Sequence, residues 1–191
     1  MNGLNTKNHL RDALDRYPLL AQIAINAAVS AGSLLLCTAL TPLRLPGLEL
    51  LGVGVDWPLI WVVSWSVGRL WWVAAAGGAV AGLLQDGMTG LTPSHAWGLA
   101  LVGFLTARLH PRSGETAWVM MALTTFVLVA VSETVMAAQF AYLYGRDASD
   151  VWALHQRVTL CSAILSSLWS PIVSLPLSRW WRMMESLGNR P

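Results

Sequence analysis

The chain has 191 residues, of which 55% are hydrophobic and only 12% carry a charge. This apolar content exceeds what a soluble core of this length needs, so a soluble protein is excluded and an integral membrane protein is expected. The net charge of +2 is small and the cations lie near the ends of apolar runs, which excludes a nucleic-acid-binding surface.

Six apolar runs follow a polar N-terminal stretch, and they predict an all-α bundle of six transmembrane helices. The runs cover residues 19–40, 55–68, 70–85, 95–109, 116–143 and 153–178. The first run is too long for the apolar region of a signal peptide, so we expect it to remain as a span. The predicted organisation is a cytoplasmic tail over residues 1–18, a single transmembrane bundle over 19–182 and a short cytoplasmic tail over 183–191.

Small residues recur at every fourth position in the first run, at Ala24, Ala28 and Gly32. The third run repeats the pattern at Ala74, Gly78 and Gly82. Such spacing lets two helix backbones approach closely, which favours association inside a bilayer. Two interpretations stay open: packing within the bundle, which is the plainer one, and docking of a partner helix, including one from a second copy of the chain.

The second and third runs could form one long helix with Arg69 in its middle, and the distribution of cations decides against this. With six spans and a cytoplasmic N-terminus, nine of the twelve Lys and Arg residues lie on the cytoplasmic side, whereas merging the two runs places six outside. Cations favour the cytoplasmic side of membrane proteins. We therefore predict two helices separated at Arg69 and two cytoplasmic termini.

Tryptophans mark the expected helix ends. Seven of them are expected to anchor the bundle at headgroup depth: Trp57, Trp71, Trp72, Trp118, Trp152, Trp180 and Trp181. Trp57, Trp61 and Trp65 also follow one another at four-residue spacing, which draws a stripe down one helix face. We interpret this stripe as lipid-facing or packing surface rather than as a ligand cage.

Several ionisable residues are expected at membrane depth. A charged side chain there costs roughly 2.5 to 3.5 kcal/mol of insertion free energy, so it is expected to have a partner or a function. In the six-span topology the following all lie on the outer side: Asp56, Asp86, His95, Glu133 and Arg157. One interpretation is a fold-holding network in which Arg157 pairs with Glu133 and His95 with Asp86. The other is a proton relay or a substrate site, and we favour the network.

Catalytic and metal-binding motifs do not occur in the sequence. Nothing matches a Gly-x-Ser-x-Gly elbow, a His-Glu-x-x-His helix or a phosphate-binding loop. The four histidines and two cysteines do not have metal-ligand spacing. We expect neither an enzyme nor a bound cofactor or metal.

The order of several motifs carries a resemblance to a known family. Asp56 opens the second span, Gly82-Leu83-Leu84-Gln85-Asp86 ends the third, and Gly90 precedes His95-Ala96-Trp97-Gly98-Leu99. The flanking segments that add to the pattern are Pro42-Leu43-Arg44-Leu45-Pro46-Gly47, Ser132-Glu133-Thr134 and Trp169-Ser170-Pro171. Taken together, roughly residues 34 to 182 resemble the MreD family of rod-shape-determining proteins.

The resemblance implies a six-helix fold similar to the substrate-binding component of energy-coupling-factor transporters, located in the bacterial inner membrane. It implies a scaffold that positions or activates lateral peptidoglycan synthesis and so maintains rod shape. The implied partners are MreC, the actin-like MreB, the glycosyltransferase RodA and the elongation penicillin-binding transpeptidase. The residues that would be critical for the fold or for partner contact are Asp56, Gly82, Asp86, Gly90 and Gly98.

Two alternatives to a scaffold remain. A vitamin-type binding component of a transporter would have the same six-helix shape, and its cavity would use Asp56, Asp86, His95 and Glu133. An intramembrane enzyme would need a nucleophile, and the sequence offers no clear one.

Overall fold

The computed structural model describes residues 19–43, 49–90, 93–110, 118–145 and 148–188. This part of the chain forms six helices: α2 (Leu19–Leu40), α3 (Trp57–Ser66), α4 (Trp71–Thr89), α5 (His95–Leu109), α6 (Trp118–Tyr144) and α7 (Ala148–Gly188). The predicted all-helical fold is confirmed, and each apolar run corresponds to one helix, although α4, α6 and α7 extend beyond their runs. An antiparallel hairpin of two short strands between α2 and α3, β1 (Glu49–Leu50) and β2 (Val53–Gly54), was not predicted.

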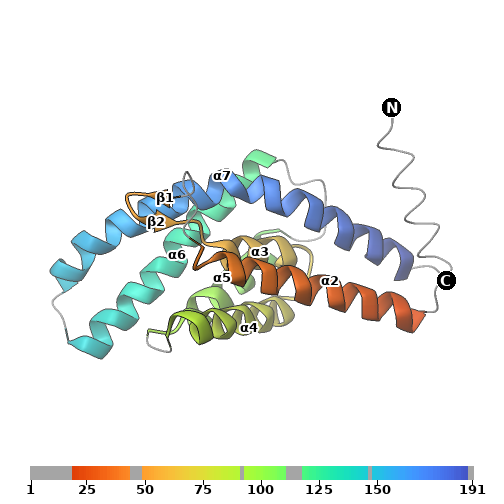
Figure 1. Ribbon diagram of the computed structural model, residues 1–191, viewed down its shortest axis with the longest axis horizontal. Helices are drawn as coiled ribbons and strands as arrows, with labels where there is room; N and C mark the ends of the chain where they lie inside the picture. The colour runs from red at the N-terminus through yellow and green to blue at the C-terminus, as the bar shows by residue number, and fades with distance from the viewer. Residues whose placement is uncertain (1–18, 44–48, 91–92, 111–117, 146–147, 189–191) are drawn as a thin grey trace.

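Helix α3 is the centre of the molecule. It packs against each of the other five helices, and α7 arches along one side of the bundle with α6 beside its first half (Figure 1). Nine of the ten residues of α3 are buried, as expected for a helix that is apolar all round. Asp56 caps its N-terminus by accepting a hydrogen bond from the Leu59 N–H at 3.1 Å, and Pro58 lies in its first turn.

In the part of the chain that the structure describes, three helices are long and apolar enough to span a membrane. The qualifying segments are Leu20–Leu40 in α2, Val119–Tyr144 in α6 and His155–Met184 in α7. Their length and hydropathy are those expected of a membrane protein. Helices α3 and α5 have 10 and 15 residues, fewer than the ~20 that cross the hydrocarbon untilted.

A turn over residues 67–70 separates α3 from α4, so the alternative of one long helix through Arg69 is wrong. Gly68 has a φ of +73°, a conformation that glycine adopts without a steric penalty and that ends many helices. Its N–H donates to the His110 carbonyl at 3.2 Å, which joins the turn to the end of α5. The Arg69 guanidinium lies 4.0 Å from the centre of the Trp65 ring.

Helices α4 and α5 approach each other through glycines. A Cβ atom at Gly78 would collide with the Leu99 carbonyl oxygen, and one at Gly82 would collide with the backbone of Ala96. From the other side, a Cβ at Gly103 would meet the backbone of α4. The small residues of α4 therefore serve packing within the bundle, as predicted.

The small-residue face of α2 has no such neighbour among the described residues. Ala24, Ala28 and Gly32 are all exposed, and a Cβ atom at Gly32 would meet no atom within 4 Å. Helix α2 instead packs through another face, where Leu34 and Cys37 are buried. For α2 the interpretation as packing within the bundle is wrong.

The tryptophan stripe of α3 lies in the core, which confirms packing rather than lipid contact. Trp61 stacks on Trp65 at 5.4 Å between ring centroids and meets Trp181 edge-on at 6.2 Å. Its Nε1–H donates to the Ser33 hydroxyl at 2.8 Å. Headgroup anchoring by Trp57 and Trp181 is therefore wrong, since both side chains are buried.

For the other tryptophans, headgroup anchoring stays a prediction. Trp71 and Trp72 at the start of α4 are about half exposed, as interfacial anchors should be. The Trp180 side chain is partly buried. The side chains of Trp118 and Trp152 lie outside the described residues.

Helix α7 is longer than expected. It has 41 residues, contains Pro171 and Pro176, and curves along its length (Figure 1). The prolines account for the bend, because each removes a backbone donor inside the helix. The predicted C-terminal tail from residue 183 is corrected, since the helix continues to Gly188. The predicted N-terminal tail lies outside the described residues.

Candidate functional site

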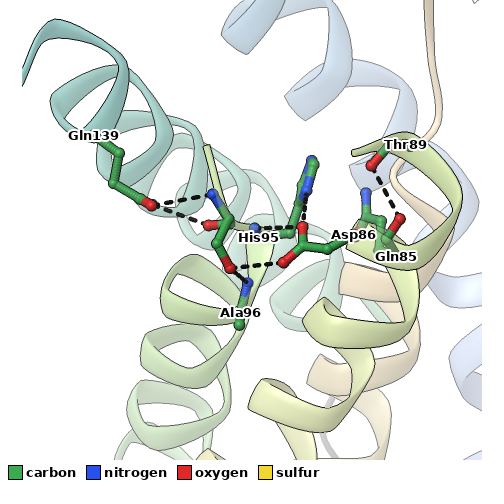
Figure 2. Close-up of polar contacts among 7 residues, drawn as sticks. Gln85, Asp86, Thr89, His95, Ala96 and Gln139 are labelled. Atoms are coloured by element: carbon green, nitrogen blue, oxygen red, sulfur yellow. Dashed lines mark hydrogen bonds and ion pairs between the residues drawn. The ribbon is translucent and has the colours of Figure 1, made fainter. Parts of the chain in front are cut away.

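The turn between α4 and α5 is held by one buried carboxylate. Asp86, in the last turns of α4, accepts hydrogen bonds from the Ser94 hydroxyl at 2.6 Å and the His95 backbone N–H at 2.8 Å (Figure 2). His95 Nδ1 lies 2.7 Å from the same carboxylate and donates to it, because a carboxylate can only accept. The predicted pairing of His95 with Asp86 is confirmed.

Ser94 is the N-cap of α5, and its hydroxyl also accepts from the Ala96 N–H at 3.2 Å. Gln139 of α6 holds this residue from the other side (Figure 2). The Gln139 side-chain oxygen accepts from the Ser94 N–H at 3.2 Å, and its amide nitrogen donates to the Ser94 carbonyl at 3.0 Å. Gln139 was not singled out from the sequence, although a lone amide within an apolar helix was a signal for it.

Two of the glycines carried by the resemblance have structural roles here. Gly90 ends α4 with a φ of +124°, and its N–H donates to the Asp86 carbonyl at 2.8 Å. A Cβ atom at Gly98 would lie 2.6 Å from the Ser132 hydroxyl oxygen, so this glycine lets α5 approach α6. Both glycines thus help to hold α5 in its position between α4 and α6.

Four of the five predicted ionisable residues come together in one place. Asp56 lies within electrostatic range of His95 and of Glu133, and His95 is bonded to Asp86. The Asp56 backbone N–H donates to the Ser166 hydroxyl at 2.9 Å, which fixes the start of α3 against α7. We call Asp56, Asp86, His95 and Glu133 the polar cluster.

The members of the polar cluster differ in their hydrogen bonding. The Asp86 carboxylate is fully engaged, whereas the Glu133 carboxyl group has no hydrogen-bond partner among the described residues. Gln85, which is 7% exposed, also keeps its side-chain oxygen buried without a partner in the part of the chain that is described. The Asp86–His95 part of the cluster is therefore a closed hydrogen-bonded cap, whereas the Glu133 carboxyl group takes no part in it.

The predicted pairing of Glu133 with Arg157 is wrong. Within the described residues no ion pair joins the two, and the Arg157 side chain is exposed. Arg157 belongs to a face of α7 that continues through the exposed residues Leu160 and Ile164, so it points away from the bundle. Glu133 is partly buried and has Asp56 as its charged neighbour instead.

We expect Glu133→Gln and Arg157→Gln to be energetically independent. The changes in unfolding free energy of the two single variants should add in the double variant to within about 0.5 kcal/mol, because the side chains share no contact. Chemical denaturation of the detergent-solubilised protein measures this double-mutant cycle. A coupling energy well above that value would contradict the geometry described here.

A line of buried hydroxyls was missed by the sequence analysis. Serines occupy every fourth position on the inward face of α7: Ser162, Ser166, Ser170 and Ser174. Ser170 meets the Thr125 hydroxyl at 2.7 Å, and Ser174 meets the Ser64 hydroxyl at 2.6 Å. Hydroxyl pairs of this kind join helices where lipid offers no hydrophobic gain. The four-residue spacing was the available signal.

The described residues contain no group of three or more His, Cys, Asp or Glu side chains that could hold a metal ion. The polar cluster can form hydrogen bonds and exchange protons, since it combines two carboxyl groups with the Asp86–His95 pair. Comparisons with known proteins found no family model, no curated protein and no solved structure that matches this chain. Its function is therefore inferred from its own contacts and exposed surfaces.

Proposed function

We propose that this chain is a non-enzymatic scaffold of the bacterial cell-elongation machinery, which positions or activates lateral peptidoglycan synthesis from within the inner membrane. The observation that carries the proposal is the exposed small-residue face of α2, a helix surface suited to close approach by a partner helix. The resemblance of roughly residues 34 to 182 to the MreD family supports the same reading. On that basis its partners are MreC, MreB, RodA and the elongation transpeptidase.

All six helices lie in the membrane in this proposal, with both termini in the cytoplasm. The exposed face of α7 supports the placement: Arg157 and Arg179 bound an exposed apolar stripe of Leu160, Ile164, Leu168, Ile172 and Leu175. The two arginines are about 33 Å apart along the helix. This matches the roughly 30 Å of hydrocarbon in a bilayer, with arginine side chains reaching the headgroups at both ends.

Depletion of the protein in its rod-shaped host is expected to produce round or swollen cells. A scaffold of lateral wall synthesis would be lost, while septal synthesis would continue. The measurement is the cell aspect ratio together with incorporation of a fluorescent D-amino acid along the side wall. Depleted cells that keep their rod shape would contradict the proposal, and a stoichiometric small-molecule ligand in the purified protein would favour the transporter alternative.

Replacement of Ala24 and Ala28 together by leucine is expected to leave the fold intact and to abolish copurification of MreC. Both side chains are exposed, so the added bulk meets no atom of this chain but blocks close approach by another helix. The matched control is Ala76→Leu with Ala138→Leu, which enlarges two exposed alanines on other helices. Unchanged MreC recovery from the α2 variant, or loss of its folded monomer, would count against this docking face.

A further inference from the structure

Arginines gather at one end of the bundle, which is the inner end in the placement proposed above, on which this inference rests. Two hydrogen bonds fix which segments meet there. The Gly68 N–H donates to the His110 carbonyl at 3.2 Å, and the Ser64 hydroxyl of α3 meets that of Ser174 in α7 at 2.6 Å. We call the described arginines within eight residues of these contacts the inner rim: Arg69, Arg108, Arg179 and Arg182.

The two ends of the bundle differ in charge. The acidic side chains that the structure describes all belong to the outer end, where α3 and α5 begin: Glu49, Asp56, Asp86 and Glu133. Over the whole chain, the proposed topology gives the inner side nine Lys and Arg residues against four Asp and Glu, and the outer side three against six. A negatively charged ligand is therefore attracted to the inner end and repelled from the outer end.

Arg108, near the end of α5, is the arginine of the inner rim best placed to contact such a ligand. Its side chain is exposed and forms no ion pair within the described residues. The guanidinium lies 5.6 Å from the centre of the Phe104 ring, and Phe104 meets Trp71, the first residue of α4, edge-on at 5.9 Å. The planar fork of a guanidinium matches the oxygens of a phosphate group, and an aromatic neighbour limits the orientations that binding must restrict.

Exposed apolar side chains adjoin Arg108. Leu109 is 62% exposed, and at the start of α4 Leu70, Trp71 and Trp72 are 62%, 50% and 57% exposed. Tryptophan rings favour the depth of the lipid headgroups, where one edge is apolar and the other is wet. A soluble anion would leave this apolar surface uncovered, whereas the acyl chains of a lipid would cover it. The surface therefore fits a ligand that is anionic at one end and apolar at the other.

We propose that the inner rim binds an anionic phospholipid, with the lipid phosphate on the Arg108 guanidinium and the acyl chains against Trp71, Trp72 and Leu109. Basic surfaces at the cytoplasmic ends of transmembrane helices attract anionic headgroups in this way. Arg179 and Arg182 are exposed on α7 and attract anionic lipid to the same leaflet. A neutral phospholipid would make the same apolar contacts but would gain nothing from the charge of the rim.

Photoactivatable lipids test this site on the full-length protein in vesicles of phosphatidylglycerol and phosphatidylcholine in equal amounts. The two probes are phosphatidylglycerol and phosphatidylcholine with the same diazirine in one acyl chain, so they differ only in the headgroup. Mass spectrometry measures the label on residues 70–72 and 109. We expect the anionic probe to label these positions at least about fivefold more than the neutral probe, the factor that one arginine supplies at a membrane surface. Equal labelling by the two probes would overturn the proposal and leave the placement of the rim intact.

Arginine variants show whether the charge of the rim causes the preference. Arg108→Gln should lower the ratio of anionic to neutral labelling about fivefold, and Arg108→Lys should keep most of it. Arg157→Gln is the matched control, an exposed arginine at the outer end, and should leave the ratio unchanged. An unchanged ratio in Arg108→Gln would overturn the proposal. Loss of anionic labelling on addition of inorganic phosphate or poly-glutamate would also overturn it, in favour of a soluble anion, and absence of label from both lipids would refute the placement itself.

Discussion

Replacing Asp86 by alanine is expected to remove most of the folded protein from the membrane. The carboxylate is 2% exposed and accepts from Ser94, from the His95 backbone and from the His95 ring. Its loss leaves these donors without an acceptor, at a cost on the order of 3 to 5 kcal/mol. That is a large share of the roughly 5 to 15 kcal/mol by which folded proteins are stable.

Thermal unfolding of the detergent-solubilised protein measures this effect. Asp86→Asn, which keeps one acceptor oxygen, should lose less stability than Asp86→Ala. Met88→Ala is the matched control two residues away on the same helix, because that side chain is about half exposed and should be replaceable without loss. An Asp86→Ala protein that melts within about 2 °C of the unmodified chain would show that the carboxylate does not hold the turn.

The second large effect is expected from Gly78→Leu. A Cβ at this position collides with the Leu99 backbone, which no side-chain rotation can relieve. Separation of α4 from α5 should cost upwards of about 3 kcal/mol, above the usual range for overpacking. Gly32→Leu is the matched control, since it belongs to a small-residue face with the same spacing but meets nothing within 4 Å.

Size-exclusion chromatography with a fluorescent tag compares the two variants directly. Gly78→Leu should appear as aggregate or be degraded, and Gly32→Leu should elute as the unmodified monomer. Equal behaviour of the two variants would mean that the close approach of α4 and α5 is not required for folding.

Helix positions were largely predictable from hydropathy. The bounds of α2 and α5 agree with the apolar runs at both ends, and the break at Arg69 followed from the sidedness of the cations. Hydropathy works well for α2 and α5 because each is one continuous apolar segment bounded by polar or turn-forming residues. The β1–β2 hairpin escaped prediction because each strand has only two residues, too few to show the alternating pattern of a strand.

Contacts between helices were less predictable, and distance along the chain explains the difference. Asp86 and His95 are nine residues apart, with only a short segment between their helices, so the sequence nearly fixes their meeting. Glu133 and Arg157 lie on two long helices, where the rotation of α7 about its own axis decides which residue faces inward. Spacing alone could not reveal that rotation.

The small-residue faces make the same point. The faces of α2 and α4 have the same four-residue spacing, yet Gly78 is packed against α5 and Gly32 is exposed. The four-residue spacing indicates that another helix can approach closely. Which helix does so depends on the packing of the whole bundle. Trp57 and Trp181 were misplaced for a related reason, because a helix end near the membrane surface can still be covered by neighbouring helices.

The central position of α3 has a consequence for biogenesis. A helix of 10 residues covers about 15 Å, which is too short to bridge the hydrocarbon of a bilayer by itself. Its stability depends on the helices that enclose it, and two of these, α6 and α7, are synthesised last. The final arrangement of α3 is therefore reached late, after the C-terminal half has been inserted. An N-terminal fragment ending before α6 would contain every residue of α3 and still lack its native environment.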